Sequence, residues 1–572
     1  MTVPPIKQLI LGPIPDQYHP ELDVVVSFHS FVNLEKIYPT WHTLPILTVR
    51  YDQRALLAFT DQFLEDIVMP NIAAHLNQLH GVTRSALFWR VLVMPYVLEL
   101  WGMMISALLL LIPVIDAHPE EKIHGELLTI DGNWDFVDII DFNLRGLKNP
   151  TFVYWLLSQL CIQFAPKQWH LSEHPTAVDR PTFTESAPHS DTRRFQGVEG
   201  FSEPQRDLFS WMLRLKSFIK PTAHPISGRR QSPYLNDAPI FDSEKWELAL
   251  RTVLPTFFND ILFRNLPLTV TRNFKVFDQK ARQLKYRKNA LRVIRTSYYH
   301  HEEVKYYMAH ALNAGEVILG SQHGGTYGIT QYHFTSSMLE IRDRWFVSWG
   351  WQNQEGISEN IIPMASPELS KIHNRHLKKS EDIVWIATHM CAIRLGSLYS
   401  EYLGWDWVHH INDKFRFLRT LDPTLHQRLL YRPHPDTQGC INEIPSLHRE
   451  YPSLKISSGG IQETVLGAAL LIFDNTSTTL NFVIAANTPF ILIIPNENRF
   501  SRESIPVFDQ LVAAGIAFFS PELAAQAINT MPNIAEWWAS STVQKARCAW
   551  MNAYARTSPT PFWDWARMLW NT

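Results

Sequence analysis

A glycine-rich loop that contains one histidine follows a predicted strand in the middle of the chain. The apolar stretch 316–321 predicts a strand, and it leads directly into the sequence QHGGTYG. Ligands usually bind in loops that follow the strands of a parallel sheet, and glycines let the backbone approach a substrate closely. His323 could act there as a base near neutral pH, or it could be a structural histidine in a tight turn. We predict that His323 is the catalytic base, in a substrate loop formed by Gln322, Gly324, Gly325, Tyr327 and Gly328.

A histidine between two prolines follows a later predicted strand. Residues 432–436 read RPHPD, and the prolines restrict the backbone on both sides of His434. The side chains of Arg432 and His434 can both donate hydrogen bonds to phosphate oxygens. A plain proline turn is the alternative for this motif on its own.

A hydroxyl-rich turn precedes a predicted helix in the same half of the chain. The apolar run 471–473 is followed by DNTSTT and then by a helical pattern at 480–486. A helix start presents free backbone N–H groups and favours anions, although a simple N-cap is the alternative. This turn and the RPHP motif are predicted to follow neighbouring strands, so both should lie at one carboxyl edge. We therefore predict a phosphate site that joins Arg432 and His434 to Asn475, Thr476, Ser477, Thr478 and Thr479.

Strand and helix patterns alternate through the second half of the chain, which predicts a parallel sheet with right-handed crossovers. Helical stretches such as 406–421 and 461–468 separate predicted strands at 383–387, 429–432, 454–457, 470–473 and 490–494. The first half has a long predicted helix at 55–79 and short predicted strands at 6–14, 23–29, 316–321 and 346–351.

Composition narrows the range of partners. The net charge of −3 gives no basic field of the kind that nucleic-acid binding requires. The four cysteines form no CxxC pair, which argues against a disulfide framework or a zinc site and fits a reducing cytoplasm. A metal site could be drawn from the aspartates at 131, 135, 138 and 141, but acids of turns and helix faces are the favoured interpretation. We predict neither a metal ion nor a cofactor.

Two segments raise the question of membrane contact. The stretch 91–115 is long and apolar enough to span a bilayer, with Glu99 as its only charge. Glu99 near the middle and Pro95 favour a core helix instead, and a peripheral contact with the inner face of the cytoplasmic membrane is left open. The basic run at 275–295 favours a solvated helix face over a surface for anionic lipid.

The ordered set of motifs resembles a known family. QHGG with YG, then RPHP, then DNTSTT before a helix and NTP, resembles bacterial surface-polysaccharide transferases of O-antigen regions, which have the GT-B fold. More distantly, the set is similar to capsule Kdo transferases, GT-B sialyltransferases and CDP-glycerol glycerophosphotransferases. The matching part covers roughly 316–495. The resemblance implies that His434, Ser477 and Thr478 hold the phosphate of a cytidine nucleotide and that His323 is the base, whereas the acidic catalytic motif of the sialyltransferases is not recognisable.

The resemblance also implies an α/β, GT-B-like architecture, with two Rossmann-like domains facing a central cleft and extra helices in the N-terminal half and at the C-terminus. We expect an acceptor-side domain at 1–360 with a polar insertion near 166–240, and a nucleotide-binding domain at 381–545. A linker is expected at 355–380, and a C-terminal helix at 546–572 is expected to pack back.

Three functions remain open at this point. The first is a metal-independent, cytoplasmic glycosyltransferase that moves a sugar from a CMP-activated ulosonic or nonulosonic acid to a glycan or lipid-linked glycan acceptor. The second is the transfer of a polyol phosphate from a CDP donor. The third is a non-catalytic carbohydrate-binding or assembly protein with the same fold. The presence of His323, Arg432 and His434 together favours an enzyme.

Overall fold

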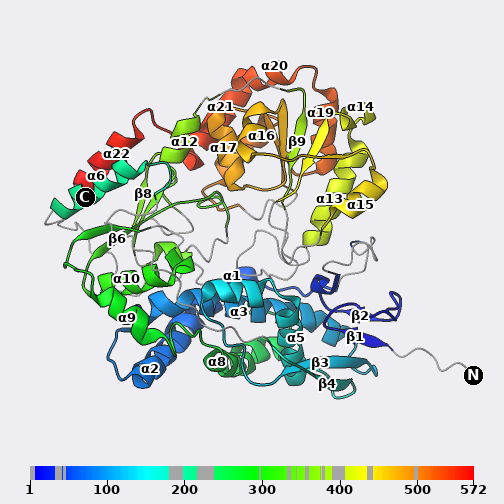
Figure 1. The fold of residues 1–572 in the computed structure, drawn as a ribbon. Coiled ribbons are helices and arrows are strands. Elements are labelled where there is room, and N and C mark those ends of the chain that lie inside the picture. The colour runs from blue at the N-terminus through cyan, green and yellow to red at the C-terminus, as the bar shows by residue number, and fades with distance from the viewer. Residues whose placement is uncertain are drawn as a thin grey trace, which may run out of the picture.

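Three parallel sheets organise the protein in the computed structural model (Figure 1). The structure describes residues 7–31, 42, 47–178, 198–215, 238–294, 298–331, 337–342, 344–353, 360–373, 375, 380–388, 406–434, 442–494 and 500–571. The strands of the N-terminal sheet are, in spatial order, β2 (Val24–Val25), β1 (Gln8–Ile10), β3 (His124–Ile130) and β4 (His170–Thr176). Those of the middle sheet are β5 (Leu291–Val293), β6 (Val317–Ser321), β7 (Trp345–Ser348) and β8 (Ile361–Pro363).

The C-terminal sheet is doubly wound. Its spatial order is β11 (Lys455–Ile456), β10 (Leu429–Arg432), β9 (Ile383–Ile386), β12 (Leu470–Phe473), β13 (Phe490–Ile493) and β14 (Ala517–Phe518). The chain starts in the centre, adds two strands on one side and then returns to the other side, so a topological switch point lies between β9 and β12. The prediction that the RPHP motif and the hydroxyl-rich turn follow neighbouring strands is therefore wrong, because β9 lies between β10 and β12.

The helices of this half cover both faces of the C-terminal sheet, at the top of Figure 1, except for the last one, at Pro561–Asn571, which packs on the middle sheet. They are α13 (Asp406–Thr420), α14 (Pro423–His426), α15 (Ile444–Glu450), α16 (Ile461–Gly467), α17 (Thr478–Ala486), α18 (Ile505–Ala513), α19 (Pro521–Thr530), α20 (Ile534–Ala539), α21 (Ser541–Tyr554) and α22 (Pro561–Asn571). Side chains of β9 alternate between two buried clusters, with Val384 on one face and Ile383 and Trp385 on the other. This alternation is what a strand covered on both faces requires.

The first half is dominated by helices, most of which fill the lower part of Figure 1, whereas the helices Glu203–Leu215 and Pro367–Ile372 lie next to α22. They are α1 (Gln53–Phe63), α2 (Met69–His80), α3 (Ala86–Ala117), α4 (Ile139–Phe142), α5 (Pro150–Phe164), α6 (Glu203–Leu215), α7 (Glu244–Leu248), α8 (Leu254–Arg264), α9 (Phe274–Arg282), α10 (Glu302–Asn313) and α12 (Pro367–Ile372). The predicted strand at 23–29 is only partly correct, because the chain turns into a 3-10 helix at Phe28–Phe31 directly after β2.

The apolar stretch at 91–115 lies inside α3, at the centre of the N-terminal core. Ser85 caps this helix by accepting a hydrogen bond from the Phe88 N–H, and α3 packs against α2, α5, α8 and α10. Within the described part of the chain, α3 is the one helix long and apolar enough to cross a membrane, and 94% of its most apolar window is buried in the protein. A helix that is apolar on all sides is buried in the core of a large domain or spans a membrane, and the packing here corresponds to the core helix that the sequence favoured.

The C-terminal helix crosses back onto the first half of the chain. Trp565 and Leu569 of α22 belong to one buried cluster with side chains of β5, β6 and β7, and α22 also contacts α6 and α12. The stretch 355–380, which was expected to be a linker, instead contributes β8 to the middle sheet and α12 to this contact in its described part. Two facing parallel sheets and a returning helix are the GT-B-like arrangement that was expected, with the N-terminal sheet as a third one.

Charged segments of the first half have structural partners. Asp138 caps α4 by accepting a hydrogen bond from the Asp141 N–H, and Asp141 pairs with Arg145 at 2.6 Å. These aspartates therefore act as the turn and helix acids that the sequence favoured.

In the basic run, Lys275 and Arg282 are solvent-exposed. Arg292 is an exception to the predicted solvated face, because it is buried and pairs with Glu316.

Candidate active site

The loop after β6 is fixed from within by Gln322. The Oε1 atom of this buried side chain accepts hydrogen bonds from the Trp349 backbone N–H at 2.8 Å and from the Trp351 indole at 2.9 Å. Its Nε2 donates to the Gly324 carbonyl oxygen at 2.8 Å. The amide of Gln322 thus holds the loop after β6 to the segment after β7.

Gly325 brings this loop into direct contact with the hydroxyl-rich turn. The Gly325 N–H donates to Thr478 Oγ1 at 2.8 Å. A Cβ atom on Gly325 would lie only 2.5 Å from the Ser477 carbonyl carbon and 2.6 Å from the Thr478 nitrogen. Only glycine fits there without a shift of the backbone, which is the close approach that the sequence predicted for this loop. The carboxyl edges of the middle and C-terminal sheets therefore meet at this point.

A second set of contacts closes the same edge. Gly328 has a φ of +74°, which favours glycine, and its carbonyl accepts a hydrogen bond from Ser501 Oγ at 2.8 Å. The Ser501 N–H donates to the Ile329 carbonyl at 2.8 Å, and Thr330 forms a β-bridge with Phe500. The loop after β6 is thus tied to two separate segments of the second half.

His323 lies in this loop, half-buried, and forms a chain of hydrogen bonds into the protein interior. Its Nδ1 is 3.0 Å from the Tyr327 hydroxyl oxygen, and that hydroxyl donates to Glu340 Oε2 at 2.5 Å. Tyr327 and Glu340 are both buried, at 4% and 1% exposure. Sequence reasoning identified His323 and Tyr327 but missed Glu340, because nothing in its neighbourhood marks it.

The hydroxyl-rich turn begins α17 without the simple capping bond that was its alternative interpretation. Ser477 is the N-cap residue, and its side chain makes no capping hydrogen bond to the helix. Asn475, Ser477 and Thr479 are half-buried, whereas Thr476 is buried. The hydroxyl of Ser477 and the first N–H groups of α17 can therefore serve an anion.

The RPHP motif lies two strands away. The Arg432 guanidinium donates to the Gly459 carbonyl at 2.7 Å and to Thr464 Oγ1 at 3.2 Å, so it secures the turn before α16. His434 is exposed at the carboxyl end of β10, and the motif from 435 onward lies outside the described residues. Because strands are spaced by about 4.8 Å, the ends of β10 and β12 are separated by about 10 Å. This is the spacing of the backbones, and long side chains such as that of Arg432 can extend across part of it. The joint phosphate site of both motifs stays a prediction.

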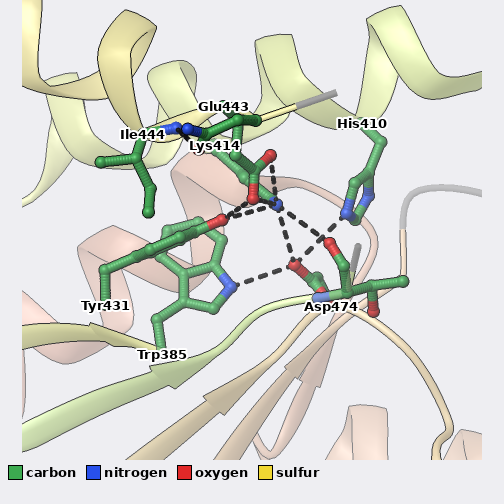
Figure 2. Close-up of polar contacts among 9 residues, drawn as sticks. Trp385, His410, Lys414, Tyr431, Glu443, Ile444 and Asp474 are labelled. Atoms are coloured by element: carbon green, nitrogen blue, oxygen red, sulfur yellow. Dashed lines mark hydrogen bonds and ion pairs between the residues drawn. The ribbon is translucent and has the colours of Figure 1, made fainter. Parts of the chain in front are cut away.

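A buried polar cluster, which we call the Lys414 cluster, adjoins the turn (Figure 2). It consists of Trp385, His410, Lys414, Tyr431, Glu443 and Asp474. The Lys414 ammonium is 1% exposed and lies 2.7 and 2.8 Å from the Glu443 oxygens and 3.8 Å from Asp474. Its sequence signal was weak, because His410 and Lys414 are simply four residues apart on a predicted helix.

Asp474 connects this cluster to the switch point. Its Oδ1 accepts from the Thr388 N–H at 2.8 Å, just after β9, and its Oδ2 accepts from the Trp385 indole at 3.1 Å. Burial alone would raise the pKa of Asp474. The charges of His410 and Lys414 and the hydrogen bonds from His410 and Thr388 outweigh burial and hold this pKa well below its usual range. A charged Asp474 thus joins the ends of β9 and β12 directly before the hydroxyl-rich turn.

A cavity of about 240 Å³ opens beside the same turn. Thr478 and Thr479 line it together with mostly apolar side chains, which are Ile372, Ile461, Gln462, Val465, Leu466 and Phe482. It offers space for an apolar part of a ligand next to the hydroxyl groups.

Of the comparisons with known proteins, the family model gives the class of this protein. A family model described as the LIC12162 family transferase matches residues 7–569. No curated protein matches the chain. A solved structure of a variant of the wall teichoic acid polymerase TagF is similar over 47% of this chain and 75% of that chain, with 11% sequence identity and a TM-score of 0.28. At that score the structural likeness carries no argument of its own.

Proposed function

The chain belongs to the LIC12162 family of transferases, and on that premise we propose that it is a glycosyltransferase of surface-polysaccharide biosynthesis. The proposed donor is a nucleotide sugar, a CMP-activated ulosonic or nonulosonic acid. The proposed acceptor is a glycan or lipid-linked glycan of an O-antigen, lipopolysaccharide or capsule.

One observation carries the proposal, namely the contact between Gly325 and Thr478. It brings the loop of His323 and the helix start at Ser477 to one place, at the switch point of a doubly wound sheet. A base and an anion site from two facing sheets are what a transfer between two bound substrates needs.

In the proposed reaction, His323 Nε2 accepts the proton of an acceptor hydroxyl while the hydroxyl oxygen bonds to the anomeric carbon of the donor sugar. The bond from that carbon to the phosphate breaks, and CMP leaves with the electron pair. Ser477 and the N-terminus of α17 stabilise the leaving phosphate. The mechanism uses no metal ion and no cofactor.

The distance between the motifs suggests how they divide the donor. Ser477 and Thr478 would hold the phosphate, and His434, about two strand spacings away, would contact another part of the nucleotide. The apolar cavity beside Thr479 would take a part of the substrates that carries no charge.

Nucleotide binding tests the proposal directly. Thermal unfolding of the full chain is measured with CMP, CDP, UDP and GDP, with and without EDTA. A rise in the unfolding temperature with CMP that EDTA does not remove is the expected result. A larger response to CDP would favour the polyol-phosphate transferase, and no response to any nucleotide would favour the non-catalytic binding protein. Turnover that stops with EDTA and returns with magnesium or manganese would overturn the metal-independent mechanism.

We also propose a cytoplasmic location with a peripheral inner-membrane contact. The exposed basic side chains Lys275 and Arg282 on α9 support a contact with anionic lipid. Co-sedimentation with vesicles that contain anionic lipid, compared with neutral vesicles, tests the contact. Equal recovery with both would remove it.

A further inference from the structure

The hydrogen bonds between His323, Tyr327 and Glu340 have a direction that follows from counting protons. A phenol has one proton to donate, and beside an ionised Glu340 that proton goes to Glu340 Oε2 at 2.5 Å. At the 3.0 Å contact with His323 Nδ1, the Tyr327 oxygen must then accept. The proton of the neutral imidazole is therefore on Nδ1, and Nε2 carries the free lone pair.

We propose that Glu340 is a positioning residue whose carboxylate, acting through the Tyr327 hydroxyl, holds His323 in the tautomer with the proton on Nδ1. If the proposed transferase function is right, this tautomer is the one that lets Nε2 accept the acceptor proton. The imidazolium that forms then keeps its Nδ1–H bonded to Tyr327 and lies near the buried negative charge. No proton passes to Glu340 in this step.

The surroundings of Glu340 suit this role. The residue lies in the helical turn Ser337–Ile341, and its neighbours include the Tyr299 hydroxyl and the Arg344 guanidinium. Burial raises the pKa of Glu340 above its usual value, and His323, the Tyr327 hydroxyl, Arg344 and Tyr299 offset only part of that rise. A protonated Glu340 would instead donate to the Tyr327 oxygen. Tyr327 would then donate to His323 Nδ1 and move the imidazole proton to Nε2.

The tautomer can be measured without any substrate. In protein labelled with ¹⁵N-histidine, the two ring nitrogens of His323 are identified by comparison with His323→Ala, and their shifts report which one carries the proton. Wild type is expected to show a protonated Nδ1 and an unprotonated Nε2. Tyr327→Phe keeps the aromatic ring and removes only the hydroxyl, so it is expected to move the proton towards Nε2. A wild-type proton on Nε2, or no change in Tyr327→Phe, would overturn the proposal.

Kinetics give the second readout. In a Ser-His-Asp triad, replacing the orienting carboxylate by an amide costs about 10⁴ in kcat. Here a phenol separates the two groups, so Glu340→Gln should lower kcat by about 10- to 100-fold and change the acidic limb of the pH profile. The Kd for the nucleotide should stay within about twofold of wild type. Unchanged kcat and an unchanged pH profile would count against Glu340.

Matched controls separate positioning from stability. Glu316→Gln removes a buried carboxylate that pairs with Arg292 at 2.8 Å, at the opposite end of β6. Tyr306→Phe removes a buried hydroxyl that donates to the Thr269 carbonyl at 2.7 Å. Both should change stability while leaving the His323 tautomer and kcat as in wild type. If His323→Ala remains active although the tautomer is as expected, the proposed function fails, but the positioning of His323 by Glu340 stands. If His323→Ala is inactive and the wild-type proton is on Nε2, the positioning by Glu340 fails, but the proposed function stands.

Discussion

Adding one methyl group at Gly325 tests whether the two halves of the protein meet where the geometry puts them. In Gly325→Ala, the new Cβ would lie 2.5 Å from the Ser477 carbonyl carbon and 2.6 Å from the Thr478 nitrogen. Both are backbone atoms, so a whole segment must move. Overpacking of this kind costs about 1–3 kcal/mol, and loss of the hydrogen bond to Thr478 adds about 1 kcal/mol. The free energy of unfolding should therefore fall by about 2–4 kcal/mol.

The neighbouring glycine provides the control. In Gly324→Ala the new Cβ would lie 3.1 Å from Thr478 Oγ1, a tight contact that a shift of a few tenths of an ångström relieves without moving a backbone segment. The free energy of unfolding should therefore fall by only about 1 kcal/mol or less in Gly324→Ala. Urea unfolding followed by tryptophan fluorescence measures both variants, and X-ray scattering of the native proteins reports any separation of the two halves.

The comparison has a clear refuting outcome. If Gly325→Ala unfolds at the same urea concentration as Gly324→Ala and has the scattering curve of wild type, the loop after β6 and the start of α17 do not touch in solution. The convergence of His323 and Ser477 on one site would then have no structural support.

Four further predictions concern the site and its support. His323→Ala should lower turnover by about 10²–10⁴-fold with the nucleotide Kd little changed, and full turnover would exclude it as the base. His434→Ala should weaken CMP binding about 10- to 100-fold in calorimetry without loss of stability, since this side chain is exposed; equal affinity would remove it from the site. Lys414→Met leaves two buried carboxylates without their cation and should lower the free energy of unfolding in urea by about 3–5 kcal/mol. The control Lys245→Met, at an exposed lysine, should lower it by less than about 0.5 kcal/mol. Similar losses in both variants would contradict the ion-pair geometry. Because the pKa of Asp474 is depressed in the folded protein, its stabilising contribution should be complete above the ordinary pKa of 3.8 and be lost as the pH falls towards the lower folded-state value. The difference in unfolding free energy between wild type and Asp474→Asn should therefore stay constant between about pH 5 and 8 and shrink below about pH 4.

Local patterns determined much of this protein. Period and apolar content predicted β6, β9, β10, β12 and β13 to within a residue or two, because a strand covered on both faces needs a short, continuous apolar run. Glycine chemistry predicted the close approach at Gly325, since only a residue without a side chain can lie against another backbone. The helix start at Ser477 followed from its run of hydroxyl residues.

Strand order was decided by tertiary structure alone. β9 separates β10 from β12, and no local signal at Arg432 or Asp474 encodes which strand lies between them. The short strands β8 and β14 were missed because two or three residues give too little periodicity to recognise. The seven-residue strands β3 and β4 were missed as well, and β4 lies in the segment that was expected to be a polar insertion.

The buried polar partners could not be found from the sequence either. Glu340 and Glu443 look like ordinary surface acids when read along the chain, yet folding places one beneath Tyr327 and the other around the Lys414 ammonium. Burial makes such charges costly unless each finds a partner, and the partners come from segments distant in sequence. The sequence could therefore name His323 and Tyr327, whereas only the packed structure showed that the Tyr327 hydroxyl lies between His323 Nδ1 and the Glu340 carboxylate.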